Sequence, residues 1–125
     1  MDTNYKISGN KLITDNFTTS FEYNIGQIEC WDEMYVVMLD IPVGVDELDN
    51  VYGVDFNGKI VWRIESPLKA FNVVKETQGY MYYAKSIYVC INLHEKGILT
   101  ATTFFSMCYT VDHKTGKLLA ETMVK

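Results

Sequence analysis

The stretch Asn50–Glu65, NVYGVDFNGKIVWRIE, decides the fold, because two runs of β-forming residues meet within it at Asn57-Gly58. Asn and Gly tolerate the positive φ angles that a tight type I′ turn requires. An Asn-Gly pair between two such runs is the strongest short-range signal for a β-hairpin. We therefore predict an antiparallel hairpin at this point of the chain.

A two-residue loop would fix the register of this hairpin. Its pairs are then Asp55–Ile60, Val54–Val61, Gly53–Trp62 and Tyr52–Arg63. The indole of Trp62 would lie across Gly53, and the Arg63 guanidinium beside the Tyr52 ring would contribute roughly 0.5–1 kcal/mol if exposed. A three-residue loop with a bulge at Gly58 would shift the register by one residue and lose both contacts. We expect the two-residue loop.

Composition bounds the fold class. The chain has 125 residues, of which 48% are hydrophobic and 14% aromatic, so we expect a single folded β-rich domain over residues 1–125. The alternating runs predict about nine antiparallel strands arranged as stacked hairpins, in a sandwich, a barrel or a propeller-blade-like stack. At most one short helix is expected, near 66–78, where Ser66 can cap and Pro67 suits the first turn. An irregular crossover is the open alternative there.

Four hydrophobic runs indicate how the strands are buried. Residues 17–23 alternate apolar and polar side chains, as a half-buried strand does. Met34–Leu39 is apolar on both faces, which favours a central strand. The run Ile98–Asp112 is too long for one strand and should bend near residues 104–106. In Ser86–Leu93 the predicted inward face is Ile87, Val89, Ile91 and Leu93, with Tyr88, Cys90 and Asn92 on the other face.

The sequence also bears on location and thiol chemistry. It has no run of ~20 apolar residues, the length that a membrane span requires. Its first residues are polar, so we expect a cytoplasmic protein that does not bind membranes. The three cysteines, Cys30, Cys90 and Cys108, lie in apolar runs and are expected to be free thiols. A disulfide between Cys90 and Cys108 is the alternative.

Charge is distributed unevenly along the chain. The span Leu12–Gly58 contains ten acidic residues and no Lys or Arg, whereas the span from Lys59 onward contains nine basic and five acidic residues. Such asymmetry bears on partners rather than on the fold. It disfavours nucleic-acid binding and favours a basic protein partner, with fast, salt-sensitive association. The alternative is a solvated acidic flank that keeps the protein soluble.

The central hairpin has an echo near the end of the chain. VYGVDFNGKIVWRIE and MCYTVDHKTGKLLAET share Tyr, one residue, Val-Asp, a turn, Gly-Lys and two apolar residues, and Ala120 stands in place of Trp62. Asp before such a turn can accept hydrogen bonds from loop N–H groups, and Gly supplies a positive φ at its end. We interpret the repeat as a turn-building device. The preceding runs MYVVMLD and IYVCINL also correspond loosely.

This repeated pattern resembles the outer hairpin of β-propeller repeats of the pyrroloquinoline-quinone dehydrogenase type. The resemblance covers one hairpin in each half of the chain. Those enzymes bind quinone and calcium through residues of several blades, and none of those residues is matched here. Propellers need roughly four or more blades to close. The resemblance therefore implies stacked antiparallel hairpins in a compact domain, or a ring made by oligomerisation.

No sequence motif for catalysis or cofactor binding stands out. The two histidines, His94 and His113, fall in predicted turns, and with Cys108 they would form a metal site only if those turns adjoin. The acidic run Asp46-Glu47-x-Asp49 lacks the ligand spacing and glycine of a calcium-binding EF-hand loop. We therefore expect no metal, no cofactor and no enzymatic activity.

The function expected from these features is the capture of a basic protein. Bacterial immunity proteins, which neutralise cationic toxin domains, resemble this chain in size and charge. The expected contact residues, with the tryptophan as an aromatic anchor, are Trp31, Asp32, Glu33, Asp46, Glu47 and Asp49. The alternative is a small-ligand-binding domain lined by Trp62 and by Tyr80, Tyr82, Tyr83 and Tyr88. The identity of the partner and the oligomeric state stay open.

Overall fold

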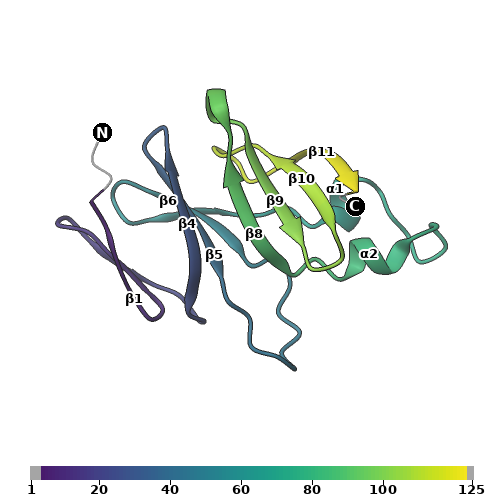
Figure 1. The fold of residues 1–125 in the computed structure, drawn as a ribbon, viewed down its shortest axis with the longest axis horizontal. Helices are drawn as coiled ribbons and strands as arrows, with labels where there is room; N and C mark the ends of the chain where they lie inside the picture. Colours follow the sequence, from purple (N-terminus) through teal and green to yellow (C-terminus); the bar gives the residue numbers. More distant parts are fainter. Residues whose placement is uncertain (1–3, 124–125) are drawn as a thin grey trace.

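Three antiparallel β-sheets stand side by side in this protein (Figure 1). The structure, a computed structural model, describes residues 4–123, and in each sheet the strands pair in chain order. The first sheet consists of β1 (Lys6–Ser8), β2 (Lys11–Ile13) and β3 (Thr18–Ser20). The middle sheet consists of β4 (Ile25–Trp31), β5 (Met34–Leu39), β6 (Val51–Asp55) and β7 (Ile60–Arg63). The last sheet consists of β8 (Tyr88–Leu93), β9 (Leu99–Thr103), β10 (Met107–Val111) and β11 (Leu118–Met123).

The mainly β architecture agrees with the prediction from the sequence, although the described residues form eleven strands rather than about nine. One reason is that the run 98–112 is not a bent strand but the β9–β10 hairpin, in whose turn Ser106 has a φ of 67°. Over residues 4–123 the three sheets form an open stack and not a closed ring.

Two short helices, α1 (Pro67–Ala70) and α2 (Tyr80–Ala84), connect β7 to β8, where at most one was expected. The Ser66 hydroxyl caps α1 as predicted, accepting a hydrogen bond from the Leu68 N–H at 3.3 Å. That helix ends after one turn, and the chain continues irregularly to α2. No helix in the described part of the chain is long and apolar enough to cross a membrane.

The middle sheet is buried on both faces, which confirms the prediction for its strand β5: five of the six residues of β5 are buried. The first core lies between the first and middle sheets and is built from Leu12, Phe21, Ile25, Ile28, Tyr35, Val37, Leu39 and Val54. The second core lies between the middle and last sheets. Its buried residues are Val36, Met38, Val51, Trp62, Ile64, Tyr88, Ile91, Leu99, Ala101, Met107, Tyr109, Val111 and Leu118.

Both cross-strand contacts predicted for the central hairpin are confirmed. Trp62 faces Gly53, and Tyr52 faces Arg63, whose guanidinium carbon lies 5.4 Å from the centre of the tyrosine ring. A Cβ atom on Gly53 would collide with the indole. The side chain of the largest residue in the hairpin therefore occupies the space that the glycine leaves free.

The predicted two-residue loop of this hairpin is wrong. The Asp55 N–H donates to the Lys59 carbonyl at 2.9 Å, which leaves residues 56–58 as a three-residue loop. A β-bulge at Val61 then inserts one more residue and restores the register before Trp62. A two-residue turn with both φ angles positive occurs instead at Asp32-Glu33, where φ is 51° and 61°.

The Trp62 indole also reaches the last sheet. It packs against Gly116 in the β10–β11 turn, and its Nε1–H donates to the His113 carbonyl at 2.8 Å. The same arrangement recurs one sheet earlier, where Phe17 packs against Gly58 in the β6–β7 turn. The first and middle sheets thus each rest an aromatic side chain on the turn glycine of the next sheet.

The interpretation of the sequence repeat as a turn-building device is confirmed. The Asp55 carboxylate accepts a hydrogen bond from the Lys59 N–H at 3.0 Å, and the Asp112 carboxylate accepts one from the Lys114 N–H at 2.9 Å. The glycines that follow have φ angles of 86° and 77°. A β-bulge also follows each turn in the corresponding place.

A further bulge explains why the faces of β8 were predicted wrongly at its start, although Ile91 is buried and Asn92 is exposed as predicted. The register between β8 and β9 shifts by one residue at Val89. Val89 is consequently 50% exposed, while Tyr88 and Ile91 are buried in the second core. The runs MYVVMLD and IYVCINL form the second strand of one sheet and the first strand of the next, so their supposed correspondence is also wrong.

None of the three cysteines forms a disulfide, and the pairing of strands shows why Cys90 and Cys108 cannot be joined by one. Both face Thr102, from opposite sides, in the ladders β8–β9 and β9–β10. They are therefore two strand spacings apart, about 9.6 Å. A disulfide requires Cα atoms closer than about 7 Å.

We predict that Gly53→Ala destabilises the fold by about 1–3 kcal/mol, because the new methyl group overlaps the Trp62 indole. Urea denaturation measures the loss. In a Trp62→Leu background the same change should cost much less, since the ring is gone. An equal cost in both backgrounds would show that Gly53 is required for another reason.

Candidate partner-binding surface

The acidic residues expected to bind a partner lie in two separate places (Figure 1). Trp31, Asp32 and Glu33 surround the β4–β5 turn, whereas Asp46, Glu47 and Asp49 lie in the loop 40–50 that follows β5. The six residues of β5 separate the two groups by roughly 17 Å. A single small contact area cannot contain all of them.

At the β4–β5 turn, an ammonium group and an imidazole of the last sheet lie against the negative charge. Asp32 Oδ2 lies 3.1 Å from His113 Nε2 and 3.4 Å from Lys114 Nζ. The hydrogen bond from His113, followed by that from Lys114, lowers the pKa of this carboxyl group. The Trp31 indole packs against Gly97 in the β8–β9 turn. Glu33 is exposed.

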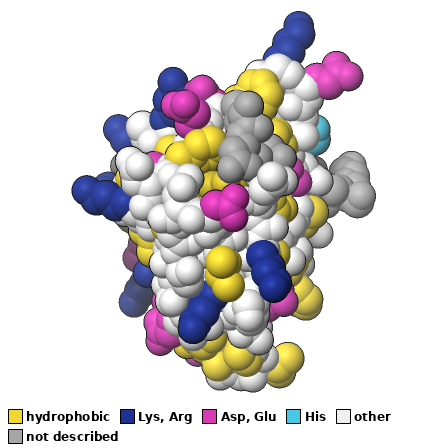
Figure 2. Space-filling model, turned by 90° about the vertical axis from the view of Figure 1, so that its left-hand side faces the viewer, with side chains coloured by type: hydrophobic (Ala, Val, Ile, Leu, Met, Phe, Trp, Pro, Cys, Tyr) yellow, Lys and Arg dark blue, Asp and Glu magenta, His cyan; other side chains and the backbone are white. Residues whose placement is uncertain are grey.

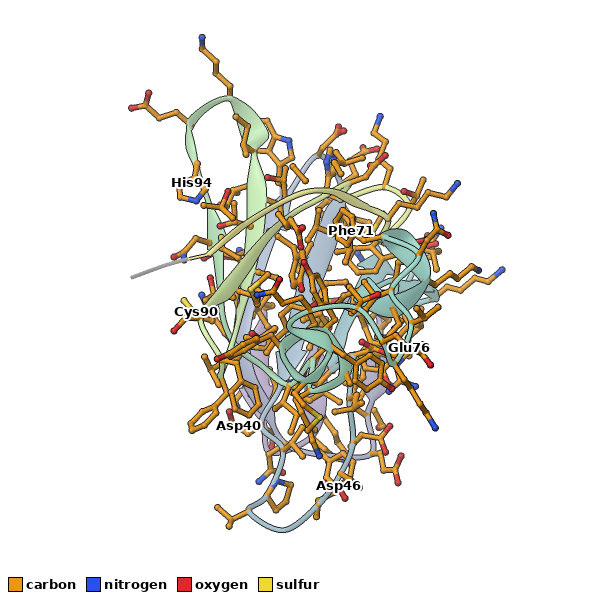
Figure 3. All side chains as sticks on the ribbon, turned by 90° about the vertical axis from the view of Figure 1, so that its right-hand side faces the viewer. Asp40, Asp46, Phe71, Glu76, Cys90 and His94 are labelled. Carbon is orange, nitrogen blue, oxygen red and sulfur yellow. The ribbon has the colours of Figure 1, made fainter. Side chains whose placement is uncertain are left out.

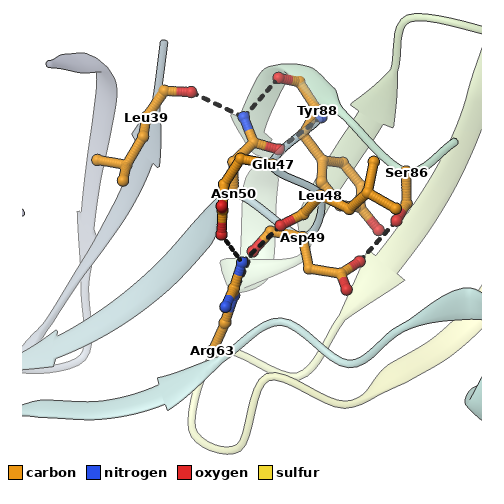
Figure 4. Close-up of polar contacts among 8 residues, drawn as sticks. All are labelled: Leu39, Glu47, Leu48, Asp49, Asn50, Arg63, Ser86 and Tyr88. Carbon is orange, nitrogen blue, oxygen red and sulfur yellow. Dashed lines mark hydrogen bonds and ion pairs between the residues drawn. The ribbon is translucent and has the colours of Figure 1, made fainter. Parts of the chain in front are cut away.

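In the loop 40–50, one arginine organises the chain (Figure 4). Arg63 Nη2 lies 2.8 Å from Glu47 Oε1 and donates to the Leu48 carbonyl at 2.6 Å. Its Nε donates to the Asp49 carbonyl at 2.9 Å. Glu47 is therefore paired, and the guanidinium that covers Tyr52 also fixes the loop.

The Asp49 side chain points inward and not toward a partner. Its Oδ1 accepts a hydrogen bond from the Ser86 hydroxyl at 2.6 Å, and its N–H donates to the Ser86 carbonyl at 2.9 Å (Figure 4). Burial raises the pKa of this carboxyl group, although the Ser86 hydrogen bond and Arg63 act in the opposite direction. Asp49 thus links the loop to the segment that enters β8.

Two side-chain amides attach β8 to the middle sheet, and sequence reasoning missed both. The buried Asn50 donates to the Leu39 and Tyr88 carbonyls at 2.7 and 2.9 Å and accepts from the Tyr88 N–H at 2.7 Å (Figure 4). The Gln27 amide likewise exchanges two hydrogen bonds with the Ile91 backbone. The amides form the hydrogen bonds with the Tyr88 and Ile91 backbone that a neighbouring strand would otherwise form at this edge of β8. No pattern in the sequence marks these two residues.

An apolar groove of about 390 Å³ lies beside the loop 40–50. Residues 41–46 form one side, and the other is formed by the start of β8 and the β9–β10 turn with Phe104 and Phe105. Phe104 is 70% exposed and Val43 is fully exposed. Large apolar side chains gathered at the surface of a single chain commonly mark a protein–protein contact.

Carboxylates flank this groove. Asp46 lines the groove itself, and Glu22 and Asp40 line an adjoining hollow of about 330 Å³ that shares Ile41 and Pro42 with it. Figure 3 shows Asp40 and Asp46 at the same end of the molecule, with His94 at the opposite end. Neither Asp40 nor Asp46 forms an ion pair within residues 4–123. We call the groove together with these three carboxylates the loop-end surface.

The loop-end surface retains a net negative charge. Lys85 also lines the groove, so three carboxylates face one ammonium group. Burial raises the pKa of the Tyr23 hydroxyl most, and the neighbouring Glu22 and Glu47 raise it further. On the side of the first sheet, by contrast, acidic and basic side chains are interspersed (Figure 2).

The residues considered for a small-ligand site and for a metal site do not come together as two groups. Tyr82, Tyr83 and Met107 line a hollow of about 440 Å³ beside α2, whereas Trp62 and Tyr88 are buried in the second core. His94 contacts Thr100, and His113 contacts Asp32. Within residues 4–123 no group of three or more His, Cys, Asp or Glu side chains is placed to hold a metal ion.

We predict that Asp49→Asn raises the melting temperature at pH 7. The folded-state pKa of Asp49 is higher than the value of 3.8 in the unfolded chain, so ionisation opposes folding above that range. Below pH 3.8 the carboxyl group is protonated in both states, and the advantage of Asn should vanish. Thermal denaturation at both pH values measures this, with the exposed Asp46→Asn as control. A lower melting temperature at pH 7 would mean that Asp49 stabilises the loop as an anion.

The comparisons with known proteins identify a family and support the fold. The chain is similar to the crystal structure of the computationally designed Ika8 protein, with 12% sequence identity and a TM-score of 0.52 over 94% of this chain and 35% of that one. It thus spans about a third of the length of that protein, and the likeness concerns the fold alone. No curated protein matches the chain. Residues 2–123 match the domain of unknown function DUF7957, and the chain belongs to that family.

Proposed function

We propose that this protein is a non-enzymatic, cytoplasmic binding domain that captures another protein through the loop-end surface. The observation that carries the proposal is the exposed pair Phe104-Phe105 beside an apolar groove whose flanking carboxylates have no cation partner within residues 4–123. Exposed aromatic side chains serve as anchors in protein interfaces. A carboxylate rim selects partners of positive charge.

The proposal narrows the contact area expected from the sequence. Of those six residues only Asp46 lies on the loop-end surface as an unpaired acid. Asp32 and Glu47 already face cations, and Asp49 bonds to Ser86 inside the fold. The expected partner therefore carries an apolar side chain that fits the groove, with Lys or Arg on either side. Neutralisation of a cationic protein, as by an immunity protein, is a function of this kind.

The resemblance of the sheets to propeller blades suggests how the loop-end surface is supported. Each four-stranded sheet is a meander that rests on its neighbour, as successive blades do. We propose that the domain is an open stack of blade-like units that serves as a rigid support for the loop-end surface. Rigid support lowers the entropic cost of ordering a contact surface when a partner binds.

Selection from a random peptide library displayed on phage tests this function. We expect enriched peptides to combine one large apolar residue with Lys or Arg, and to bind more weakly when salt rises from about 0.05 to about 0.5 M. Phe104→Ser should weaken their binding roughly tenfold or more. Asp46→Lys should weaken it and flatten the salt dependence.

Two matched variants serve as controls for this selection. Leu119→Ser removes an apolar side chain that is 62% exposed on β11, and Asp15→Lys reverses an exposed acid of the first sheet. Neither change should affect the selected peptides. Peptides without positive charge, or peptides that bind Phe104→Ser and Asp46→Lys as well as the unchanged protein, would disprove the proposed function.

A small-ligand site is the second candidate. The hollow beside α2 favours it, because Tyr82, Tyr83 and Met107 enclose about 440 Å³. A thermal-shift screen of metabolites distinguishes the two functions. Stabilisation by a compound, lost in Tyr82→Ala and kept in Phe104→Ser, would support the hollow.

A further inference from the structure

The three sheets follow one plan, and the first sheet lacks one of its parts. A residue with positive φ precedes the next strand each time: Gly9 before β2 (58°), Asp49 before β6 (53°) and Ser106 before β10 (67°). In the first two cases an asparagine follows, Asn10 or Asn50, whose amide donates to a backbone carbonyl. The strands β1–β2–β3 therefore correspond to β5–β6–β7 and to β9–β10–β11. Within residues 4–123 nothing in the first sheet corresponds to β4 and β8.

The missing strand would lie along the free edge of β1. Ser8 pairs with Lys11 across the two-residue turn Gly9-Asn10. The pair next to such a turn exchanges hydrogen bonds, and bonded pairs alternate along an antiparallel ladder. The N–H and C=O of Ile7 therefore point away from β2, toward the position that β4 and β8 occupy in the other sheets. In the last sheet, the outer edge of the first strand, β8, is instead closed by the two side-chain amides described above.

The side chains around this edge indicate what strand would fit. Ile7 lies on the face of the first core, beside Leu12, and is 41% exposed. Lys6 and Lys11 are exposed on the outer face, and neither forms an ion pair within residues 4–123. A strand paired with β1 would therefore need apolar residues on its inner face. Carboxylates on its outer face, opposite Lys6, would stabilise the pair.

We propose that the free edge of β1 binds an extended acidic segment of a partner protein, which completes the first sheet as its fourth strand. The added strand runs antiparallel to β1, takes the place that β4 holds beside β5, and covers Ile7. Main-chain hydrogen bonds to Ile7 provide affinity, and Lys6 provides selectivity. Lysine on an edge strand also discourages pairing with uncharged or basic strands. This site is separate from the loop-end surface and does not depend on the function proposed for it.

The test uses the whole protein and a capped peptide of about eight residues in which Val and Glu alternate. We expect the peptide to shift the Ile7 amide resonance in ¹H–¹⁵N NMR and to protect that amide from hydrogen exchange. A scrambled peptide and an alternating Val and Lys peptide should do neither. Ile7→Pro removes the outward N–H but no bond to β2, and should weaken binding roughly tenfold.

Two further variants keep the result unambiguous. Ile7→Thr keeps the N–H and should retain most of the binding, which separates the main-chain contact from the side chain. Lys6→Glu should weaken binding of the acidic peptide roughly threefold and should allow the alternating Val and Lys peptide to bind. Peptide binding that leaves the Ile7 amide unchanged, or no binding at millimolar peptide, would overturn the proposal. So would sedimentation data showing a dimer that Ile7→Pro abolishes, because a second copy of this chain would then occupy the edge of β1.

Discussion

The position of the Trp62 indole between two glycines is the contact on which the arrangement of the sheets depends. Gly53 lies on one side within its own sheet, and Gly116 lies on the other in the last sheet. A side chain at either position would push the ring away. Its N–H bond to His113 adds direction to what is otherwise apolar packing. The ring thus fixes where the β10–β11 turn of the last sheet lies against the middle sheet.

Much of the fold could be predicted from the sequence because local patterns carry it. Alternation and turn residues located the hairpins, and the double-sided apolar run identified β5 as central. Bulges could not be predicted, since an extra residue in a strand leaves no mark on composition. At Val61 the bulge preserved a predicted register despite a wrong loop, whereas at Val89 the bulge reversed the predicted faces of Tyr88 and Val89. The sequence of α2, YMYYA, is equally compatible with a strand, because tyrosine favours β-structure.

The candidate surface was far less accessible to sequence reasoning. Counting charges showed ten acids without a base in one span, but the cations that meet them come from distant parts of the chain. Arg63 reaches Glu47 from the neighbouring hairpin, and Lys114 reaches Asp32 from the last sheet. Phe104 and Phe105 were recognised only as the point where a long run bends. Their meeting with residues 41–46 depends on how the sheets stack.

The bulges that follow the two repeated turns have a consequence for how such a protein can diverge. The loop after Asp55 has three residues and the loop after Asp112 has four, yet the same paired positions follow in both hairpins. Loop length is therefore uncoupled from strand register. A tip can change length without moving the strands, provided that it keeps the glycine on which the neighbouring aromatic side chain packs, so divergence or the grafting of a foreign epitope is confined to the other residues of each turn.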